Sequence, residues 1–403
     1  MRLTKLYIHN YKSFYDTTIE LDKMNIVVGE NNSGKSNLID VLEFISSITK
    51  DSIDKIILDR GGLEKILNYN YSEKRIYIEL EMECKSFKTK KRFTLSQNRE
   101  TIVISQITYR KKDNKLLPMS IMGTRGNFKL KKTINKQKVC QANLLKFHLD
   151  GNIIDDKEML SLHIDDFFSL QTYAFNTETI RNDSHKESVT ELLKNGANLG
   201  KNLYEIKNNY PQTFELISNS MIGIVNEIDG IDVQETFGNY LIGFHEENKQ
   251  IGIDMVSDGT INLLATITAL NQEEDESLLL AFDEPERYLH LKAINYLLEN
   301  FRSSEKQILI TTHSTEILKY ANLDEIVFIY RDSDGDTQSM RARDIPDLEG
   351  KMERLGYERP LTLDELIASN IVGNFEGKME RLGYERPLTL DELIASNIVG
   401  NFE

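Results

Sequence analysis

Eight consecutive residues near the N-terminus have the types and spacing of a phosphate-binding loop. They match the pattern G-x-x-x-x-G-K-S and are Gly29, Glu30, Asn31, Asn32, Ser33, Gly34, Lys35 and Ser36. The glycines let backbone N–H groups turn towards a β-phosphate, Lys35 can reach the β- and γ-phosphate oxygens, and the Ser36 hydroxyl can bind Mg²⁺. Because an apolar segment at 24–28 precedes this loop and an apolar-periodic helix follows it, the sequence predicts a site for a nucleoside triphosphate and Mg²⁺.

Two acidic residues follow an apolar segment in the C-terminal half, where a nucleoside-triphosphatase needs them. The segment 278–282 (LLLAF) is predicted to be a buried strand, with Asp283 and Glu284 at its carboxyl end. We expect Asp283 to hold Mg²⁺ through water and Glu284 to orient or deprotonate the attacking water. An ordinary acidic strand end is the alternative, which would be preferred if the phosphate loop were absent.

Two histidines and a polar turn are further candidates. His313 follows another apolar segment, QILI, so we expect it at the same sheet edge, facing the γ-phosphate; a structural histidine is the alternative. His290 is explained equally well as a residue that only orders the loop after Glu284. The stretch MVSDGTINLL at 255–264, taken alone, predicts a polar turn before a helix.

The expected strands and helices predict an α/β fold. Segments at 277–284, 306–313 and 325–330 alternate with helices, which indicates a largely parallel sheet covered by helices. Strands are also expected at 2–9, 14–21 and 24–28, helices over about 187–228, and a hairpin over 239–253. Alternating segments from about 75 to 132 predict an antiparallel β lobe. We expect one head at 1–345, with an inserted basic β/α lobe at 75–180, and a tail at 350–403.

The tail consists of two identical copies of a 27-residue segment, at 350–376 and 377–403. Repeats in solenoid proteins diverge, and about three are needed to bury a core. A recent or artificial duplication is therefore preferred over a tail that docks a partner.

The charge of the chain is uneven. The net charge of −15 disfavours nucleic acid as a partner of the whole chain. Residues 85–138, however, contain about 16 lysines or arginines and two acidic residues, a balance that suits contact with a phosphate backbone. A solvated lysine-rich strand face is an equally good interpretation.

Hydropathy and cysteine content indicate a cytoplasmic protein without a membrane partner. No apolar run approaches the roughly 18 residues of a membrane span. Cys84 and Cys140 lack the paired spacing of a disulfide framework or of a cysteine metal site, so we expect reduced thiols. The run Asp332–Asp336 is not a calcium loop, because its sixth and twelfth positions are Thr337 and Arg343; an Asp-Gly hairpin is expected there.

Four motifs in order, GENNSGKS, SDGT, LLLAFDEPERYLHL and TTHS, resemble the ABC-type ATPase head shared by RecF, SMC proteins, the double-strand-break repair ATPase and OLD-family proteins. The resemblance covers about residues 1–345 and implies that ATP and Mg²⁺ are the cofactors. It also implies a homodimer in which ATP is held between two heads. Ser257, Asp258 and Gly259 of one copy would then approach the γ-phosphate bound by the other copy.

The sequence departs from this family pattern in two places. The usual signature has two glycines and a glutamine, whereas this chain has Asp258 and Thr260, so a carboxylate would lie near a phosphate unless it points away. The glutamine-bearing loop of the family is not identified, since Gln97 and Gln106 lack a diagnostic context. The segment NYKSF resembles a family pattern with a basic residue near the nucleotide, which makes Lys12 a candidate.

Three hypotheses for the function remain open at this point. The chain resembles most the stand-alone bacterial and archaeal ATPases of this group, which are similar to the ATPase components of bacterial anti-phage systems. The preferred hypothesis is therefore an Mg²⁺-dependent ATPase that dimerises on ATP, or forms a larger oligomer, and works with a separate effector such as a nuclease in anti-phage defence. The second is a slowly hydrolysing, ATP-gated scaffold. The third is a repair or recombination ATPase that binds DNA directly through the basic lobe at 85–138.

Overall fold

The computed structural model describes residues 2–83, 88–98, 101–112, 115–127, 170–182, 189–247, 249–272 and 279–345. The duplicated tail at 350–403, Cys84 and Cys140 lie outside these ranges. In the described part of the chain, no helix is both long enough and apolar enough to cross a bilayer.

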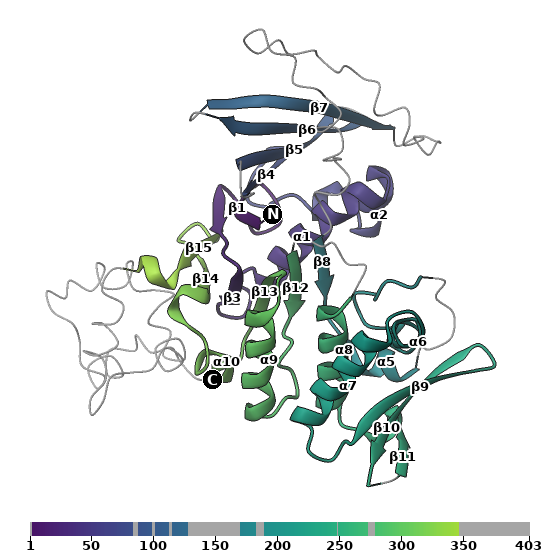
Figure 1. The fold of residues 1–403 in the computed structure, drawn as a ribbon. Helices are drawn as coiled ribbons and strands as arrows, with labels where there is room; N and C mark the ends of the chain where they lie inside the picture. Colours follow the sequence, from purple (N-terminus) through teal and green to yellow (C-terminus); the bar gives the residue numbers. More distant parts are fainter. Residues whose placement is uncertain are drawn as a thin grey trace, which may run out of the picture.

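A mixed six-stranded sheet forms the centre of the molecule (Figure 1). Its order is β15-β14-β3-β13-β12-β8, and only the hairpin strand β15 is antiparallel to its neighbour. The strands are β3 (Met24–Val28), β8 (Leu170–Tyr173), β12 (Leu279–Asp283), β13 (Gln307–Thr312), β14 (Ile326–Arg331) and β15 (Thr337–Arg341). β3 and β13 are buried along their whole length, and β12 is buried up to Asp283, because both faces of this sheet are covered.

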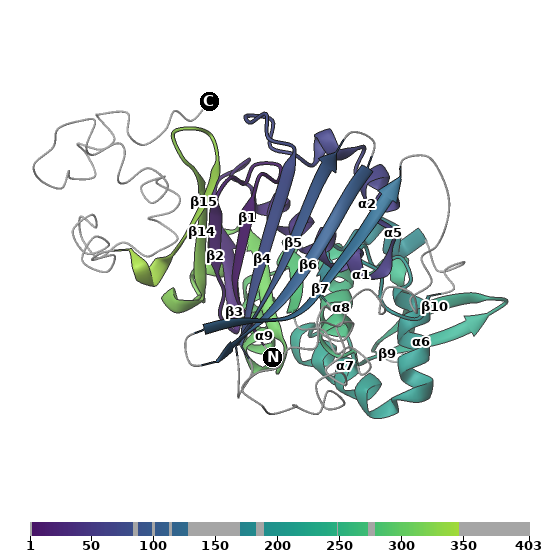
Figure 2. The same ribbon diagram turned by 90° about the horizontal axis from the view of Figure 1, so that it is seen from above.

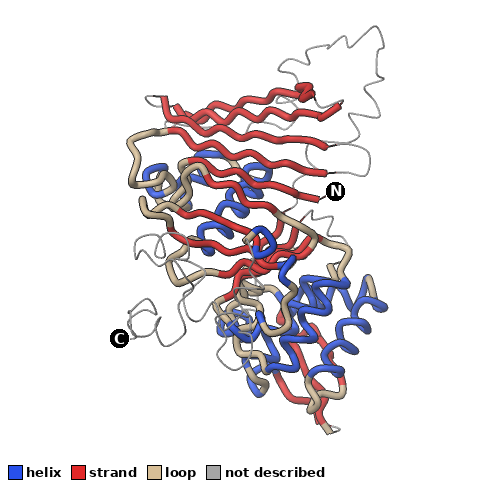
Figure 3. Tube along the Cα trace, turned by 90° about the vertical axis from the view of Figure 1, so that its left-hand side faces the viewer, coloured by secondary structure: helices blue, strands red, loops and turns tan. Residues whose placement is uncertain are grey.

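A second sheet of six antiparallel strands lies beyond the first (Figures 2 and 3). Its order is β2-β1-β4-β5-β6-β7, so the N-terminal strands begin the sheet that the predicted lobe continues. The strands are β1 (Arg2–His9), β2 (Thr17–Glu20), β4 (Arg75–Glu83), β5 (Lys88–Asn98), β6 (Thr101–Lys112) and β7 (Lys115–Asn127). The range 75–180 expected for the lobe also includes β8, which pairs with β12 in the central sheet.

Helix α1 (Lys35–Lys50) lies between the two sheets. Its apolar residues, among them Leu38, Leu42 and Phe44, share one buried cluster with residues of β1 and β4 and with Val27 and Leu309 of the central sheet. The short helix α2 (Ile53–Asp59) adds Ile56 and Ile57 to this cluster. The helix that begins at the phosphate loop is therefore held on both sides by packing.

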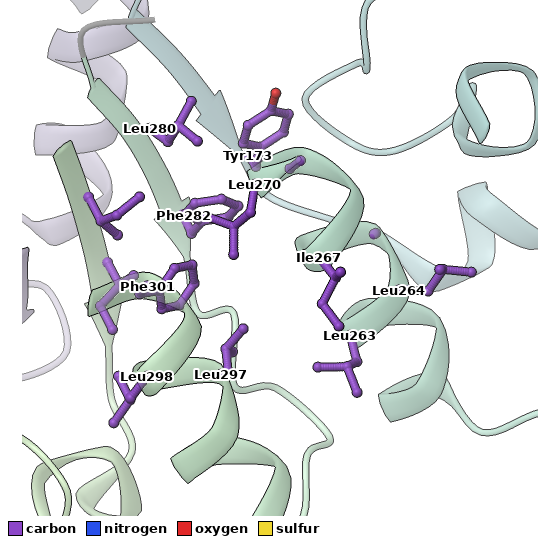
Figure 4. Packing of buried hydrophobic residues seen from close by; sticks show 14 of the residues in the cluster. Tyr173, Leu263, Leu264, Ile267, Leu270, Leu280, Phe282, Leu297, Leu298 and Phe301 are labelled. Atoms are coloured by element: carbon purple, nitrogen blue, oxygen red, sulfur yellow. The ribbon is translucent and has the colours of Figure 1, made fainter. Parts of the chain in front are cut away.

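The opposite face of the central sheet is covered by a helical layer. Helices α8 (Asp258–Leu270) and α9 (Leu291–Ser303) pack against Phe282 and its neighbours, as Figure 4 shows for Leu263, Ile267 and Phe301. Beyond them lie α6 (Leu199–Asn209), α7 (Pro211–Ile224) and a three-stranded antiparallel sheet. The strands of that sheet are β9 (Gly230–Thr236), β10 (Asn239–Glu246) and β11 (Lys249–Gly252). The short helices α5 (Thr177–Asn182) and α10 (Thr315–Leu318) follow β8 and β13.

The predicted fold class is confirmed, while three details of the sequence prediction need correction. The helical segment begins at Leu199, not near 187, because residues 189–198 form turns that include Gly196 at φ 77°. Strands β8 and β9 were not predicted, and β2 is shorter than expected. The Asp-Gly hairpin is present between β14 and β15.

Candidate nucleotide site

The phosphate loop joins β3 to α1, and close contacts to β14 and β15 explain its glycines. Gly34 has φ 118°, and a Cβ there would lie 2.5 Å from Thr337 Oγ1. A Cβ at Gly29 would lie 2.1 Å from the carbonyl oxygen of Ile329. Thr337 Oγ1 also donates to the Ser33 carbonyl at 2.8 Å. Packing therefore requires glycine at both positions, and at Gly34 the left-handed backbone requires it as well.

Lys35 is buried beneath the loop. Only 4% of its surface is exposed, and its Nζ donates to the carbonyl oxygens of Gly29 at 2.5 Å and Glu30 at 2.8 Å. Burial lowers the pKa of Lys35 to about 8, against the opposing effect of the negative charges of Glu284 and Asp283. The ammonium group thus lies within electrostatic reach of both candidate carboxylates, and loop carbonyls hold it in place.

The other loop residues divide into a buried and an exposed set. Ser33 and Gly34 are buried, whereas Ser36, at the first turn of α1, is exposed. Glu30, Asn31 and Asn32 are also exposed. Asn32 has φ 67°, and its carbonyl accepts a hydrogen bond from Arg331 Nε at 2.9 Å. The surface of the loop that the sequence assigns to phosphate and metal is therefore open to solvent.

The two candidate carboxylates lie at the carboxyl end of β12, next to the end of β13. Thr311 Oγ1 donates to Asp283 Oδ1 at 2.5 Å. The backbone N–H of Glu284 donates to the Thr311 carbonyl at 3.0 Å, and Glu284 itself has φ 48°. A non-glycine residue in this left-handed region is uncommon, and it turns the chain sharply as the strand ends.

The Glu284 carboxylate has two cationic or ionisable neighbours. Arg287 Nη2 lies 2.6 Å from Glu284 Oε2, and His313 Nε2 lies 3.6 Å from Glu284 Oε1. Burial and the positive charge of Lys35 lower the pKa of His313, so the imidazole is neutral at pH 7. The structure therefore brings Lys35, Asp283, Glu284 and His313 to one edge of the central sheet. The sequence prediction did not include Arg287.

A third carboxylate, Glu286, is buried directly behind this edge and was also not predicted. It is 7% exposed, and Thr312 Oγ1 donates to its Oε1. Burial, together with the nearby negative charges of Glu284 and Asp283, raises the pKa of Glu286 to about 7, against the opposing effect of the hydrogen bond from Thr312. Its Oε2 has no hydrogen-bond partner among the described residues.

The SDGT turn forms the N-terminus of α8. Ser257 is the N-cap, and its Oγ accepts a hydrogen bond from the Thr260 N–H at 3.1 Å. A Cβ at Gly259 would lie 2.4 Å from the Tyr288 carbonyl oxygen, so only glycine fits against the loop that follows Glu284. Asp258, the first residue of the helix, forms an ion pair with Arg181 of α5 at 2.9 Å.

The loop after Glu284 is ordered by α8. Asn262 Nδ2 donates to the carbonyls of Pro285 and Arg287, both at 3.0 Å, and the side chain is buried. His290, the sequence candidate for this role, is an exposed N-cap of α9 whose side chain makes no capping hydrogen bond. The stretch MVSDGTINLL at 255–264 thus contributes Asn262 to the candidate site, a residue that the sequence prediction did not include.

Lys12 lies against α1 with its charge paired. Its Nζ is 2.7 Å from Asp40 Oδ2, and the same carboxylate accepts from the Tyr11 hydroxyl at 2.7 Å. Arg60 Nε lies 3.3 Å from Asp40 Oδ1. Lys12 therefore lies beside the phosphate-loop helix with its ammonium engaged by a carboxylate, and its predicted place near the nucleotide stays a prediction.

Gln97 and Gln106 lie on β5 and β6 of the outer sheet, and their side chains are outside the described part. Neither strand belongs to the sheet that carries the phosphate loop.

The described basic residues of the lobe at 85–138 are largely neutralised by acidic neighbours. Lys90 Nζ lies 2.8 Å from Glu79 Oε1, and Arg92 Nη2 lies 2.7 Å from Glu79 Oε2. Lys90 also pairs with Glu81. Lys91 is buried, over the ring of Phe93. The remaining basic side chains of the lobe lie outside the described part, so the prediction of nucleic-acid contact stays a prediction.

Two family models match the chain. Residues 1–120 match a model described as "AAA ATPase domain". Residues 157–319 match one described as "AAA domain, putative AbiEii toxin, Type IV TA system". The chain is a P-loop ATPase. ATP binding follows from this assignment, and it agrees with the phosphate loop described above.

Curated relatives of the ATPase are distant but nearly full-length. The DNA replication and repair protein RecF of Acetivibrio thermocellus is 23% identical over 372 residues, covering 82% of this chain and 98% of that protein. The ATP/GTP phosphatase of Helicobacter pylori is 21% identical over 343 residues, covering 79% of this chain and 87% of that protein.

Solved structures share the fold of the ATPase. A crystal structure of an SMC head bound to the C-terminal winged-helix domain of ScpA has a TM-score of 0.53 at 16% identity, covering 84% of this chain and 98% of that one. An Smc head domain with an extended coiled coil, bound to the C-terminal domain of ScpA and derived from Pyrococcus furiosus, has a TM-score of 0.50 at 13% identity, covering 84% and 96%. The predicted SMC-like head architecture is confirmed at the level of the fold.

Proposed function

We propose that this ATPase hydrolyses ATP at composite sites formed by two copies of the chain. The observation that carries this proposal is the placement of the two halves of the site on opposite faces of one sheet. Helix α1, with Lys35 and Ser36, packs with Val27 and Leu309 on one face, whereas α8, with the SDGT turn, packs with Phe282 and Ile310 on the other. A second copy is the simplest source of an SDGT turn that faces the exposed surface of the phosphate loop.

Within one copy, each candidate side chain has a distinct task. Lys35 would leave the carbonyls of Gly29 and Glu30 for the β- and γ-phosphate oxygens. Glu284 would accept a proton from the attacking water, and neutral His313 would hydrogen-bond near the γ-phosphate. Both neighbours of Glu284 are placed to hold its carboxylate in position.

The donors available for a metal fit Mg²⁺. Ser36 offers an exposed hydroxyl and Asp283 a carboxylate at the adjoining strand end, and hard oxygen donors together with substrate phosphates are what Mg²⁺ prefers. Among the described residues there is no cluster of three or more His, Cys, Asp or Glu that could hold a metal ion alone. Bound there, Mg²⁺ would neutralise phosphate charge.

Turnover by two variants tests the catalytic assignment. Lys35→Ala is expected to abolish ATP binding, measured with a fluorescent nucleotide. Glu284→Gln should bind ATP like the wild type but hydrolyse it at least about 100-fold more slowly, the scale of a lost general base. If Glu284→Gln hydrolyses ATP at the wild-type rate, Glu284 is not the base.

A slowly hydrolysing, ATP-gated scaffold is the second candidate function. The ion pair between Arg287 and Glu284 favours it, because a carboxylate oxygen held 2.6 Å from a guanidinium is already engaged and must be released before it can accept a proton from water. Release of Arg287 would then be part of activation. A high basal turnover of the wild type, unchanged in Arg287→Ala, would exclude this role of the pair.

We further propose that the ATPase acts with a separate effector protein, such as a nuclease, in anti-phage defence. Support comes from the resemblance of the four motifs to stand-alone ATPase heads. It also comes from the second family model, which is described as a putative AbiEii toxin of a Type IV TA system. A direct role on DNA, suggested by the RecF relative, receives less support because Lys90 and Arg92 of the lobe are paired with Glu79. Duplex affinity that falls steeply between low and moderate salt would favour DNA, whereas a flat response would exclude it.

A further inference from the structure

The SDGT turn carries a negative charge at a place where an anion is expected to approach. Asp258 stands between Ser257 and Gly259, and 45% of its side chain is exposed. In the proposed composite site these neighbours meet the γ-phosphate of the partner's ATP. Two anions at such short range repel each other strongly unless a cation lies between or beside them.

Capping of helix α8 does not explain why residue 258 is an aspartate. Ser257 already caps α8 through the Thr260 N–H, and its Oγ lies 2.9 Å from Thr260 Oγ1. The Asp258 carboxylate instead turns to α5, where Arg181 Nη2 donates to Oδ1 at 2.9 Å. The hydrogen bond from Arg181 lowers the pKa of Asp258, and an arginine is always protonated in proteins, so both members are ionised at neutral pH.

The same guanidinium holds the backbone that leads into the turn. Arg181 Nη1 donates to the Ile253 carbonyl at 2.5 Å, and Nη2 donates to the Val256 carbonyl at 2.7 Å. Arg181 therefore touches the turn in two ways, through the charge of Asp258 and through two carbonyls. Of these contacts, only the ion pair with Asp258 changes the charge that an approaching phosphate meets.

We propose that Arg181 is a positioning residue of the composite site, which neutralises Asp258 so that the SDGT turn can approach the triphosphate bound by a second copy. The inference rests on the proposed function, because it needs an ATP bound by the partner. It assigns a task to the departure of this turn from the usual family signature: the acid at 258 is tolerated because α5 supplies its counter-charge.

A double-mutant cycle tests this assignment in the full-length chain. The variants are Arg181→Ala, Asp258→Ala, the double variant and Arg181→Lys. The lysine keeps the positive charge but lacks the planar guanidinium that donates to several acceptors at once. Dimer formation is measured by sedimentation velocity with a non-hydrolysable ATP analogue, and monomer nucleotide binding and thermal unfolding are measured alongside. Wild type and Ser257→Arg are included in every series.

The charge role predicts a specific pattern. Arg181→Ala should weaken nucleotide-dependent dimerisation at least about tenfold, with monomer binding of the analogue unchanged and with partial recovery as salt screens the repulsion. The loss should be at least about fivefold smaller when Asp258 is already alanine. Arg181→Lys should retain a large part of the dimerisation.

Two results would overturn the inference alone. One is a double variant as defective as Arg181→Ala, which would reduce Arg181 to a clamp on the backbone carbonyls. The other is an Arg181→Ala variant that dimerises like the wild type. A different result would contradict the proposed function itself: a wild type that forms no nucleotide-dependent dimer and sediments like Ser257→Arg. The inference about Arg181 would then be wrong as well, because it needs that dimer.

Discussion

At the scale of single residues, the candidate site is a set of carboxylates with different environments. Asp283 accepts from Thr311, Glu284 is held by Arg287, and Glu286 is buried with one oxygen unpartnered among the described residues. Different surroundings give neighbouring acids different tasks. The buried Glu286 is the neutral member at acidic pH, and it ties the end of β13 to the loop after Glu284 through Thr312.

The raised pKa of Glu286 predicts a pH dependence of stability. Its folded-state pKa of about 7 exceeds the ordinary value of 4.5, so the folded chain binds more protons than the unfolded chain between these pH values. The free energy of unfolding should therefore fall as pH rises from about 5 to 8, by up to about 3 kcal/mol at about 1.4 kcal/mol per pKa unit. Melting temperatures across this range should fall for the wild type and stay flatter for Glu286→Gln.

A second glutamate provides a control of opposite sign. Glu325 is also nearly buried, but the hydrogen bonds and charge of Arg302 lower its pKa despite burial. The contribution of the ionised Glu325 to the free energy of unfolding is present above pH 4.5 and is lost only as the pH falls below that value. The difference between wild type and Glu325→Gln should thus be constant from pH 5 to 8. Parallel profiles for wild type and Glu286→Gln would refute the role of Glu286.

At the scale of elements, α8 connects the SDGT turn to the loop that carries Glu284. Gly259 packs against the Tyr288 carbonyl, and the Asn262 side chain donates hydrogen bonds to two other carbonyls of the same loop. A displacement of the helix end is therefore expected to move the loop beside Glu284. This arrangement offers a physical route by which contact with a partner affects hydrolysis.

Removal of the Asn262 side chain tests that connection. Asn262→Ala leaves two buried carbonyls without their donor, at an expected cost of about 1–3 kcal/mol in unfolding free energy. It should also lower ATP turnover at least about tenfold while nucleotide binding persists, since Lys35 and its loop are untouched. Chemical denaturation and steady-state kinetics measure the two effects.

Asn271 at the other end of α8 supplies the control. Among the described residues, its side chain donates to the Ile267 carbonyl of its own helix at 2.8 Å and to no other group. Asn271→Ala should change turnover by less than about twofold. Equal turnover losses in the two variants would mean that α8 affects the loop only through general stability.

The sequence predicted those parts of the site that lie at strand ends. The phosphate loop, Asp283, Glu284 and His313 each follow an apolar strand, and the carboxyl ends of parallel strands meet at one edge. Arg181 and Asn262 could not be found in this way, because their partners come from distant segments, as for Arg181 and Asp258 at 77 positions apart. Strand β8 was missed because four residues are too few to display a period.

At the scale of the whole molecule, the central sheet separates the two halves of the proposed active site. Helix α1 lies between this sheet and the outer sheet, and α8 lies in the helical layer on the other side (Figures 1 and 3). The SMC-head fold of the solved relatives agrees with this architecture. In the proposed function, a head built in this way completes its site by pairing with a second copy, and a two-fold dimer would contain two equivalent sites.

The most direct test of that claim is complementation between two inactive variants. Lys35→Ala lacks a working phosphate loop, and Ser257→Arg lacks a working SDGT turn, so each alone should show no ATPase activity. In an equimolar mixture, each mixed dimer contains one intact composite site, and turnover should return to about one quarter of the wild-type rate for random two-fold pairing. A mixture that stays as inactive as its components, under conditions where mixed dimers are seen, would contradict a site shared between two copies.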